Sequence, residues 1–149
     1  MSLHRPLFTS TLLCLLTLHG ASAAGADASV RIEISGLRNA RGDVGCLLFS
    51  SAEGYPELHA RAYREKHTAI ETDRASCEFK EVAPGTYAAV VFHDENLNGK
   101  MDKNFVGMPQ EGYGASNNVR HRLSAPGFQE ASFAVGVGAV TPLSIQLGY

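Results

Sequence analysis

The chain has no tryptophan, few cysteines and no strong excess of charge, and each shortage narrows what it can do. Its 149 residues include 13 Lys and Arg against 15 Asp and Glu, a formal net charge of −2 at pH 7. A balance of this kind provides no basic surface for nucleic acid or for anionic lipid. The three cysteines form no Cys-x-x-Cys motif, so nothing in the sequence supports a thiol redox role.

Only one segment is strongly apolar, and it lies at the N-terminus. Residues 7–18 are almost all apolar or small, they follow Arg5, and residues 21–23 (Ala-Ser-Ala) supply a small-residue cleavage pattern. These features are typical of a secretory signal peptide whose apolar core is too short to span a bilayer. We therefore expect residues 1–23 to be removed and residues 24–149 to form one domain. That domain would be periplasmic or secreted, without a membrane span, and its formal charge would be −3 because Arg5 is lost.

Two cysteines, Cys46 and Cys77, remain after the signal peptide is removed. They have one possible pairing, and the oxidising compartment of an exported protein favours it. The alternative is two reduced, buried cysteines that pack as small hydrophobic side chains. We expect the disulfide, which would close a loop of about thirty residues and stabilise the fold by roughly 3 kcal/mol.

Strand patterns separated by turns dominate the rest of the chain. Residues 30–34 alternate apolar and charged side chains, as in a strand with one buried face. Residues 44–49 form a continuous apolar run, which indicates a strand covered on both faces, and we expect these two strands to form a hairpin. Residues 86–93 give the strongest strand pattern, rich in β-branched and aromatic side chains. Further strand patterns occur at 77–82, 131–135 and 141–147.

Two segments lack a strand pattern. Residues 50–68 favour helix, with Pro56 suited to a first turn, and we expect a crossover with about two helical turns. We expect its His59 and His67 to be solvated surface residues, since no spacing brings them to a third metal ligand. Residues 105–124 are rich in Gly and Asn and have little periodicity, which predicts a long irregular loop.

About seven strands with Gly/Pro-rich turns, no βαβ rhythm and no internal repeat together predict an all-β fold. We expect an antiparallel β-sandwich of immunoglobulin-like or transthyretin-like type, with a short helical crossover and one long loop. The long loop would lie at one end of the sandwich, where such domains usually carry their binding sites.

The most specific chemical pattern follows the strongest strand. Oxygen-bearing side chains stand at the first, third and fifth positions of a loop, a glycine at the sixth and a carboxylate at the ninth. This spacing wraps oxygens around a hard cation, so the sequence predicts a Ca²⁺ site. The candidate ligands are the side chains of Asp94, Asn96, Asn98 and Asp102, the carbonyl of Lys100, and Glu111 if it folds back.

The same composition also suits a loop without metal. Asp and Asn side chains bind backbone N–H groups two residues ahead and can order a turn by themselves. In addition, the glutamate that closes a calcium-binding loop at the twelfth position is missing, because Phe105 stands there. Any Ca²⁺ site should therefore be weak, with a Kd on the order of 10⁻⁴ to 10⁻³ M.

His93 directly precedes this loop, and two roles are open for it. It is either a partly exposed histidine at a strand end that binds the neighbouring loop, or a general base beside a metal-bound water. The second role would make the protein a metal-assisted hydrolase. No nucleophile or second base completes a catalytic set around it.

The stretch from residue 111 to residue 118 also permits two interpretations. It can form a lip for a polar ligand such as a glycan, with Tyr113 as the stacking face and Ser116, Asn117 and Asn118 as the polar contacts. Alternatively, its glycines meet special backbone dihedrals and its amides tie it to the Asp94 loop. The lack of tryptophan weakens the carbohydrate-binding interpretation.

Two motifs in this region, together with two turns, resemble a known family. The motifs are His93-Asp94-Glu95-Asn96-x-Asn98-Gly99-Lys100-x-Asp102 and Gly107-x-Pro109-x-Glu111-Gly112-Tyr113-Gly114-x-Ser116-Asn117-Asn118, and the turns are Gly36-Leu37-Arg38-Asn39 and Pro84-Gly85-Thr86-Tyr87-Ala88. They resemble the DUF2141 family of exported bacterial proteins, a domain of unknown function. The resemblance implies a β-sandwich that bears a signal peptide, and it implies no activity.

The sequence thus favours a non-enzymatic binding or structural module of the cell envelope, whose end loop binds Ca²⁺ weakly or is ordered by its own hydrogen bonds. Its partner would be an envelope or extracellular ligand whose identity the sequence does not indicate. A metal-assisted hydrolase that uses His93 and an accessory carbohydrate-binding domain are the alternatives.

Overall fold

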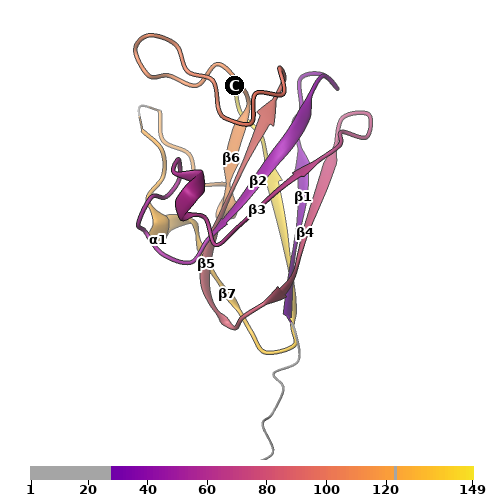
Figure 1. The fold of residues 1–149 in the computed structure, drawn as a ribbon, viewed down its shortest axis with the longest axis vertical. Coiled ribbons are helices and arrows are strands. Elements are labelled where there is room, and N and C mark those ends of the chain that lie inside the picture. The colour runs from indigo at the N-terminus through magenta and orange to yellow at the C-terminus, as the bar shows by residue number, and fades with distance from the viewer. Residues whose placement is uncertain (1–27, 123) are drawn as a thin grey trace, which may run out of the picture.

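Two β-sheets pack face to face in this protein (Figure 1). The computed structural model describes residues 28–122 and 124–149, and the expected signal peptide, residues 1–23, lies outside them. An all-β sandwich was expected, and it is confirmed with eight strands. None of the helices in the described ranges has the length and apolar character needed to cross a membrane.

The first sheet has three strands in the order β4-β1-β8. They are β1 (Ala28–Ser35), β4 (Ala75–Val82) and β8 (Val140–Gln146). β1 runs antiparallel to β4 and parallel to β8. The parallel pair departs from the purely antiparallel arrangement expected from the sequence.

The second sheet has five strands and is antiparallel throughout. Its main path is β3-β2-β5-β6, and β7 pairs with the first half of β5. The strands are β2 (Asp43–Phe49), β3 (Arg64–Thr68), β5 (Gly85–Asp94), β6 (Tyr113–Ala115) and β7 (Ser132–Val135). Short helical pieces occur at His59–Arg61, Ser116–Asn118 and in α1 (Phe128–Ala131).

The main core lies between the two sheets. Alternate side chains of β1, such as Val30 and Ile32, meet alternate side chains of β5, such as Ala89 and Val91, and all four are fully buried. A disulfide between Cys46 of β2 and Cys77 of β4 crosses this core and joins the sheets, with the Cα atoms 6.8 Å apart. The expected Cys46–Cys77 pairing is therefore confirmed.

A second apolar cluster covers the outer face of the five-stranded sheet. It includes Leu47 and Phe49 of β2 and Ala88, Val90 and Phe92 of β5. Loops and α1 cover this face, with Phe128 and Tyr55 packed against the cluster. Because both faces of β2 are covered, its apolar run is continuous, as the sequence indicated.

The expected hairpin of the first two strands is wrong. β1 pairs with β4 and β8, whereas β2 pairs with β3 and β5 in the other sheet. The turn at residues 36–42 therefore carries the chain across the sandwich. The two strands meet through buried side chains of the core, an arrangement that alternation alone does not distinguish from a hairpin.

The expected pair of helical turns in residues 50–68 is also wrong. The helical part is one 3₁₀ turn at His59–Arg61, and residues 64–68 form the edge strand β3. The strand carries the sequence Arg-Glu-Lys-His-Thr, which shows no apolar alternation. Charged side chains are common on edge strands because they discourage pairing with another chain. Here they replace the apolar alternation by which the sequence would have indicated a strand.

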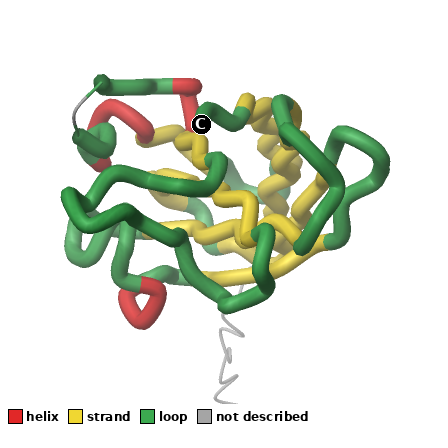
Figure 2. The backbone as a smooth tube through the Cα atoms, turned by 90° about the horizontal axis from the view of Figure 1, so that it is seen from above, coloured by secondary structure: helices red, strands yellow, loops and turns green. Residues whose placement is uncertain are grey.

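The long segment after β5 lies at one end of the sandwich, beside the turn at residues 36–42 (Figure 1). Seen from above, loops cross over the ends of the strands at this end (Figure 2). The sequence predicted this position for the loop. The candidate ligands of the predicted Ca²⁺ site are therefore gathered there.

Candidate functional site

Asp94 is the last residue of β5, and its buried carboxylate organises the loop that follows. One oxygen accepts the backbone N–H of Asn98 at 3.0 Å, and the other accepts that of Gly99 at 2.7 Å. The side chain is held on the outer face of the sheet by cross-strand pairing of Asp94 with Asp43. A left-handed φ of 76° at Gly99 permits the sharp turn, in keeping with a glycine at the sixth loop position.

The remaining loop side chains bind one another. Asn96 and Asn98 each accept a backbone N–H two residues ahead, at 3.1 and 3.0 Å. Their amide nitrogens donate to the two carboxylate oxygens of Asp102, at 2.7 and 2.8 Å. The side chains of Asn96 and Asn98 thus converge on Asp102, whereas Asp94 binds the backbone of the loop, so hydrogen bonds of its own order the loop.

Glu111 does fold back onto this loop. Its carboxylate is buried, and its two oxygens accept the backbone N–H groups of Glu95 at 2.8 Å and Asp102 at 3.0 Å. It therefore joins the first and last residues of the segment 95–102. A carboxylate oxygen has two lone pairs, so these hydrogen bonds leave acceptor capacity for a cation.

His93 lies on the other face of β5, toward the core, and is fully buried. Its Nε2 faces the carbonyl oxygen of Arg41 at 2.7 Å, so Nε2 carries the proton and donates it. Its Nδ1 accepts from the Tyr149 hydroxyl at 2.8 Å. Since both ring nitrogens are engaged by protein groups, His93 is a buried structural link and not the partly exposed residue that was expected.

Glu95 connects this end of the sandwich to the turn at 36–42. It accepts hydrogen bonds from Arg38 Nε at 2.6 Å and Asn39 Nδ2 at 3.0 Å. Burial raises the pKa of Glu95, but the hydrogen bonds from Asn39 and Arg38 and the guanidinium charge outweigh it and hold the pKa below its usual value. Arg38 also lies over the ring of Tyr149, 4.5 Å from its centroid.

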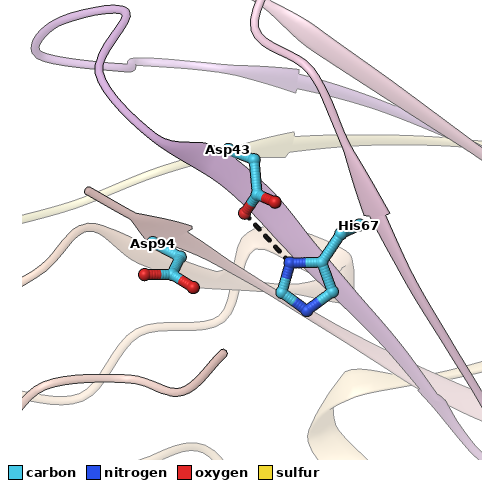
Figure 3. Close-up of side chains that lie close together, drawn as sticks. All are labelled: Asp43, His67 and Asp94. Atoms are coloured by element: carbon cyan, nitrogen blue, oxygen red, sulfur yellow. Dashed lines mark hydrogen bonds and ion pairs between the residues drawn. The ribbon is translucent and has the colours of Figure 1, made fainter. Parts of the chain in front are cut away.

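A second polar cluster, which spacing along the chain did not reveal, lies on the outer face of the five-stranded sheet. His67, Asp43 and Asp94 come from the adjacent strands β3, β2 and β5, and their ligand atoms all lie within 4.8 Å of one another (Figure 3). His67 Nδ1 lies 2.9 Å from Asp43 Oδ1. The expectation that His67 lacks convergent ligand partners is therefore wrong.

Glu65 and His59 extend this cluster. Glu65 Oε1 lies 3.4 Å from His67 Nε2 and 2.8 Å from His59 Nδ1. Burial lowers the pKa of His67, but hydrogen bonds and charges of Asp43 and Glu65 outweigh this and raise it. Glu65 and His67 alternate along one strand and so share a face of the sheet. This spacing could have indicated the cluster, but only if residues 64–68 had been recognised as a strand.

A cavity of about 360 Å³ adjoins the cluster on the same face of the sheet. Its floor is formed by side chains of the second apolar cluster, and its walls come from loops before β3 and after β5 and β6. Floor and wall residues include Leu47, Val90, Phe92, Ala115, Tyr55, Met101, Met108 and Tyr113. The cavity depends on loops that are far apart in the sequence, and no motif predicted it.

The hydroxyl of Tyr55, a residue lining this cavity, is the buried side-chain polar atom that has no hydrogen-bond partner in the described ranges. Its ring is fixed by edge contacts with Phe49 and Phe128, at centroid distances of 5.4 and 5.8 Å. Burial, followed by the nearby charge of Glu130, raises the pKa of Tyr55 to about 12. The hydroxyl therefore stays protonated at neutral pH and can donate a hydrogen bond.

The residues proposed for a glycan-binding lip have other partners. Ser116 is fully buried and accepts the N–H of Ala89 at 2.9 Å. Asn117 donates to the carbonyls of Glu130 and Ser132, and Asn118 donates to Ser144 and accepts from Gln146. These amides bind backbone next to α1 and along β8, and not the Asp94 loop. Of the set, Tyr113 lines the cavity.

The glycines within residues 111–118 allow close packing, and they do not have unusual backbone dihedrals. Gly112 has no left-handed φ, and a Cβ there would lie 2.4 Å from the ring of Tyr149. The same reason applies to Gly45 of β2, where a Cβ would lie 2.3 Å from the ring of Phe92. The absent side chain at Gly45 gives Phe92 room to reach His59 and His67, whose rings contact it edge-on.

Comparison with known proteins identifies one family. A family model described as an uncharacterized protein conserved in bacteria (DUF2141) matches residues 32–142. No curated protein and no solved structure matches the chain significantly. The matched residues run from within β1 to the first residues of β8 and include the loop between β5 and β6, in agreement with the resemblance of the sequence motifs. The chain therefore belongs to the DUF2141 family.

Proposed function

We propose that this protein is a non-enzymatic, exported binding module of the bacterial cell envelope. Its ligand is a small molecule with an apolar body and an anionic end, bound in the cavity on the outer face of the five-stranded sheet. Export is supported by the signal-peptide pattern of residues 1–23 and by the Cys46–Cys77 disulfide.

The observation that carries the proposal is the cavity itself. Small-molecule sites are typically concave, mostly apolar and furnished with a few polar groups, with volumes of about 300–1,000 Å³. The cavity has this size and an apolar floor that includes Leu47, Val90 and Phe92. The floor belongs to a rigid sheet, so it is formed before any ligand arrives.

The charges around the cavity favour an anionic end. Lys100, Lys103 and Arg122 line it, against one carboxylate, Glu57, which pairs with Lys103 at 2.5 Å. A carboxylate or similar anionic group would complement these basic side chains.

The predicted Ca²⁺ loop forms part of the cavity wall, which is consistent with this role. The segment after Asp94 supplies Lys100, Met101 and Met108 to the cavity. A Ca²⁺ ion held by Asp94, Asn96, Asn98, Asp102 and the Lys100 carbonyl would stiffen this wall. The bound ion would therefore raise ligand affinity without taking part in chemistry.

The geometry gives less support to the two alternatives. A hydrolase that uses His93 as a base needs a free ring nitrogen near solvent, and both nitrogens are bonded in the buried interior. A carbohydrate site at Ser116, Asn117 and Asn118 needs free polar groups, and these groups bind backbone.

Displacement of a fluorescent anion tests the proposal. The probe is 1-anilinonaphthalene-8-sulfonate bound to the folded protein, and we expect decanoate to displace it at least tenfold more effectively than decylamine. Ala115→Phe fills the cavity floor and should weaken probe binding at least tenfold. Ala134→Phe is the matched control, because Ala134 is exposed on β7 and lies outside the cavity.

A second variant keeps the proposal testable if Ala115→Phe does not fold. Arg122→Glu reverses a charge on the cavity wall, and Arg122 is exposed, so the fold should be retained. It should weaken decanoate several-fold and leave decanol, which has no charge, unaffected. Equal displacement by decanoate and decylamine, or undiminished probe binding by a folded Ala115→Phe variant, would overturn the proposal.

A further inference from the structure

We propose that Asp43, His67 and Asp94 form a binding site for Zn²⁺ on the outer face of the five-stranded sheet. The site is distinct from the predicted Ca²⁺ loop, although Asp94 belongs to both. It uses a nitrogen ligand and two carboxylates, whereas Ca²⁺ takes oxygen ligands alone.

Strand register builds the site. Asp43 and Asp94 are directly cross-strand partners in β2 and β5, so their side chains lie on one face of the sheet. His67 of β3 pairs with Gly45, two residues along β2 from Asp43, and therefore points to the same face. Three adjacent strands thus deliver one ligand each from a rigid scaffold (Figure 3).

The distances suit a tetrahedral ion after small side-chain adjustments. Zn²⁺ binds imidazole nitrogen and carboxylate oxygen at about 2.0–2.2 Å, which places neighbouring ligand atoms about 3.4 Å apart. The three ligand atoms here are within 4.8 Å of one another, and His67 Nδ1 is 2.9 Å from Asp43 Oδ1. Asp43 and His67 are partly exposed, so solvent can reach the fourth position.

The surroundings of His67 support metal ligation independently of these distances. A metal-bound histidine usually gives its other ring N–H to a carboxylate, which fixes the ring and its tautomer. His67 presents Nδ1 to Asp43, and its Nε2 lies 3.4 Å from Glu65 Oε1. His59 in turn binds Glu65 at 2.8 Å, and Phe92 supports the imidazole of His67 edge-on, at 5.8 Å between centroids.

Asp94 is oriented in a similar way. Both of its oxygens accept a backbone N–H, from Asn98 and from Gly99, and the residue is 1% exposed. Such hydrogen bonds hold a ligating carboxylate in place and leave lone pairs for an ion. The two carboxylates also balance the charge of one divalent ion.

Calorimetric titration of the EDTA-stripped protein with ZnCl₂ tests the site. We expect one equivalent of Zn²⁺ to bind to the wild-type protein. His67→Ala and Asp43→Asn should each weaken binding at least tenfold, while His121→Ala, which removes a surface histidine paired with Glu130, should leave it unchanged. Asp94→Asn removes the charge and one of the two acceptors of backbone N–H groups, and it should also weaken binding at least tenfold.

Substitution of Co²⁺ gives a spectroscopic readout that a merely structural role of Asp43 would not change. Bound Co²⁺ should produce visible absorption with the wild-type protein and lose it with Asp43→Asn, a change at a partly exposed residue. The absence of stoichiometric Zn²⁺ binding would overturn the proposal. It would equally be overturned if a folded Asp43→Asn variant bound Zn²⁺ as the wild type does.

Discussion

The hydroxyl of Tyr149 donates a hydrogen bond to Nδ1 of the buried His93, across 2.8 Å. In a neutral imidazole one nitrogen donates and the other accepts, and here Nε2 donates because it faces the carbonyl of Arg41, which can only accept. The same hydroxyl accepts the backbone N–H of Arg38 at 3.0 Å. Tyr149 therefore ties the end of β5 to the turn at residues 36–42.

Tyr149→Phe should destabilise the protein by about 1–3 kcal/mol, because a buried ring nitrogen would lose its donor. Urea denaturation measures the change in unfolding free energy. Tyr113→Phe is the matched control, since the Tyr113 hydroxyl makes no hydrogen bond to the described residues, and it should change stability much less. Equal effects of the two substitutions would contradict the assigned role of the Tyr149 hydroxyl.

Glu111→Gln should also lower the free energy of unfolding. An amide presents a donor where one carboxylate oxygen now accepts the N–H of Glu95 or of Asp102, so one of these groups would lose its partner. We expect a loss of about 1–3 kcal/mol by urea denaturation. Glu53→Gln is the control, because Glu53 is exposed and its ion pair with Arg61 is screened by water. A stability change no larger than that of the control would argue against Glu111 as the link of this loop.

Addition of CaCl₂ to the EDTA-stripped protein should raise its melting temperature. At ten times Kd, a site with a Kd on the order of 10⁻⁴ to 10⁻³ M stabilises by about 1.4 kcal/mol, or several degrees. Asp102→Asn removes a charge from the loop and should abolish most of the shift. Asp73→Asn, in the exposed turn between β3 and β4, should leave the shift in melting temperature unchanged. An unchanged melting temperature in both CaCl₂ and EDTA would remove the Ca²⁺ proposal.

Local patterns predicted much of this molecule. The apolar, β-branched pattern of residues 86–93 correctly predicted the strand β5. The Asp and Asn spacing after β5 predicted both the sharp turn at Gly99 and the bonds from side chains to backbone N–H groups. Each of these features depends on residues within a few positions of one another, so a short stretch of sequence is enough to predict it.

Long-range features were not predictable in the same way. Whether β1 pairs with β2 or faces it across the core depends on all eight strands, not on the turn that joins the two. The cluster of Asp43, His67 and Asp94 requires the register of three strands, one of which has no apolar alternation. The cavity requires loops from three parts of the chain to meet over one sheet face.

Loss of the Cys46–Cys77 disulfide should destabilise the fold by roughly 3–4 kcal/mol on the chain-entropy model, given the sequence separation of 31 residues. A Cys46→Ala, Cys77→Ala double variant measures this by urea denaturation. The fully buried positions of both residues add a packing loss to the entropic effect. The thiol count of the unfolded protein without residues 1–23 should rise by two on reduction, and an unchanged count would refute the disulfide.

The contact between Glu95 and Arg38 predicts a specific loss of stability in acid. Although burial raises the pKa of Glu95, the hydrogen bonds from Asn39 and Arg38 hold it below its usual value, so the unfolded chain takes up this proton first as pH falls. The stabilisation is therefore complete above the pKa of the unfolded chain, about 4.3, and is lost as pH falls through the lower folded pKa.

Glu95→Gln removes this titration, so the difference in unfolding free energy between wild type and variant should be largest near neutral pH and shrink below about pH 4. Denaturation at several pH values measures it. Glu71→Gln, an exposed control in the β3–β4 turn, should follow the wild-type curve throughout. A difference that stays constant down to strongly acidic pH would show that Glu95 acts through packing and not through its charge.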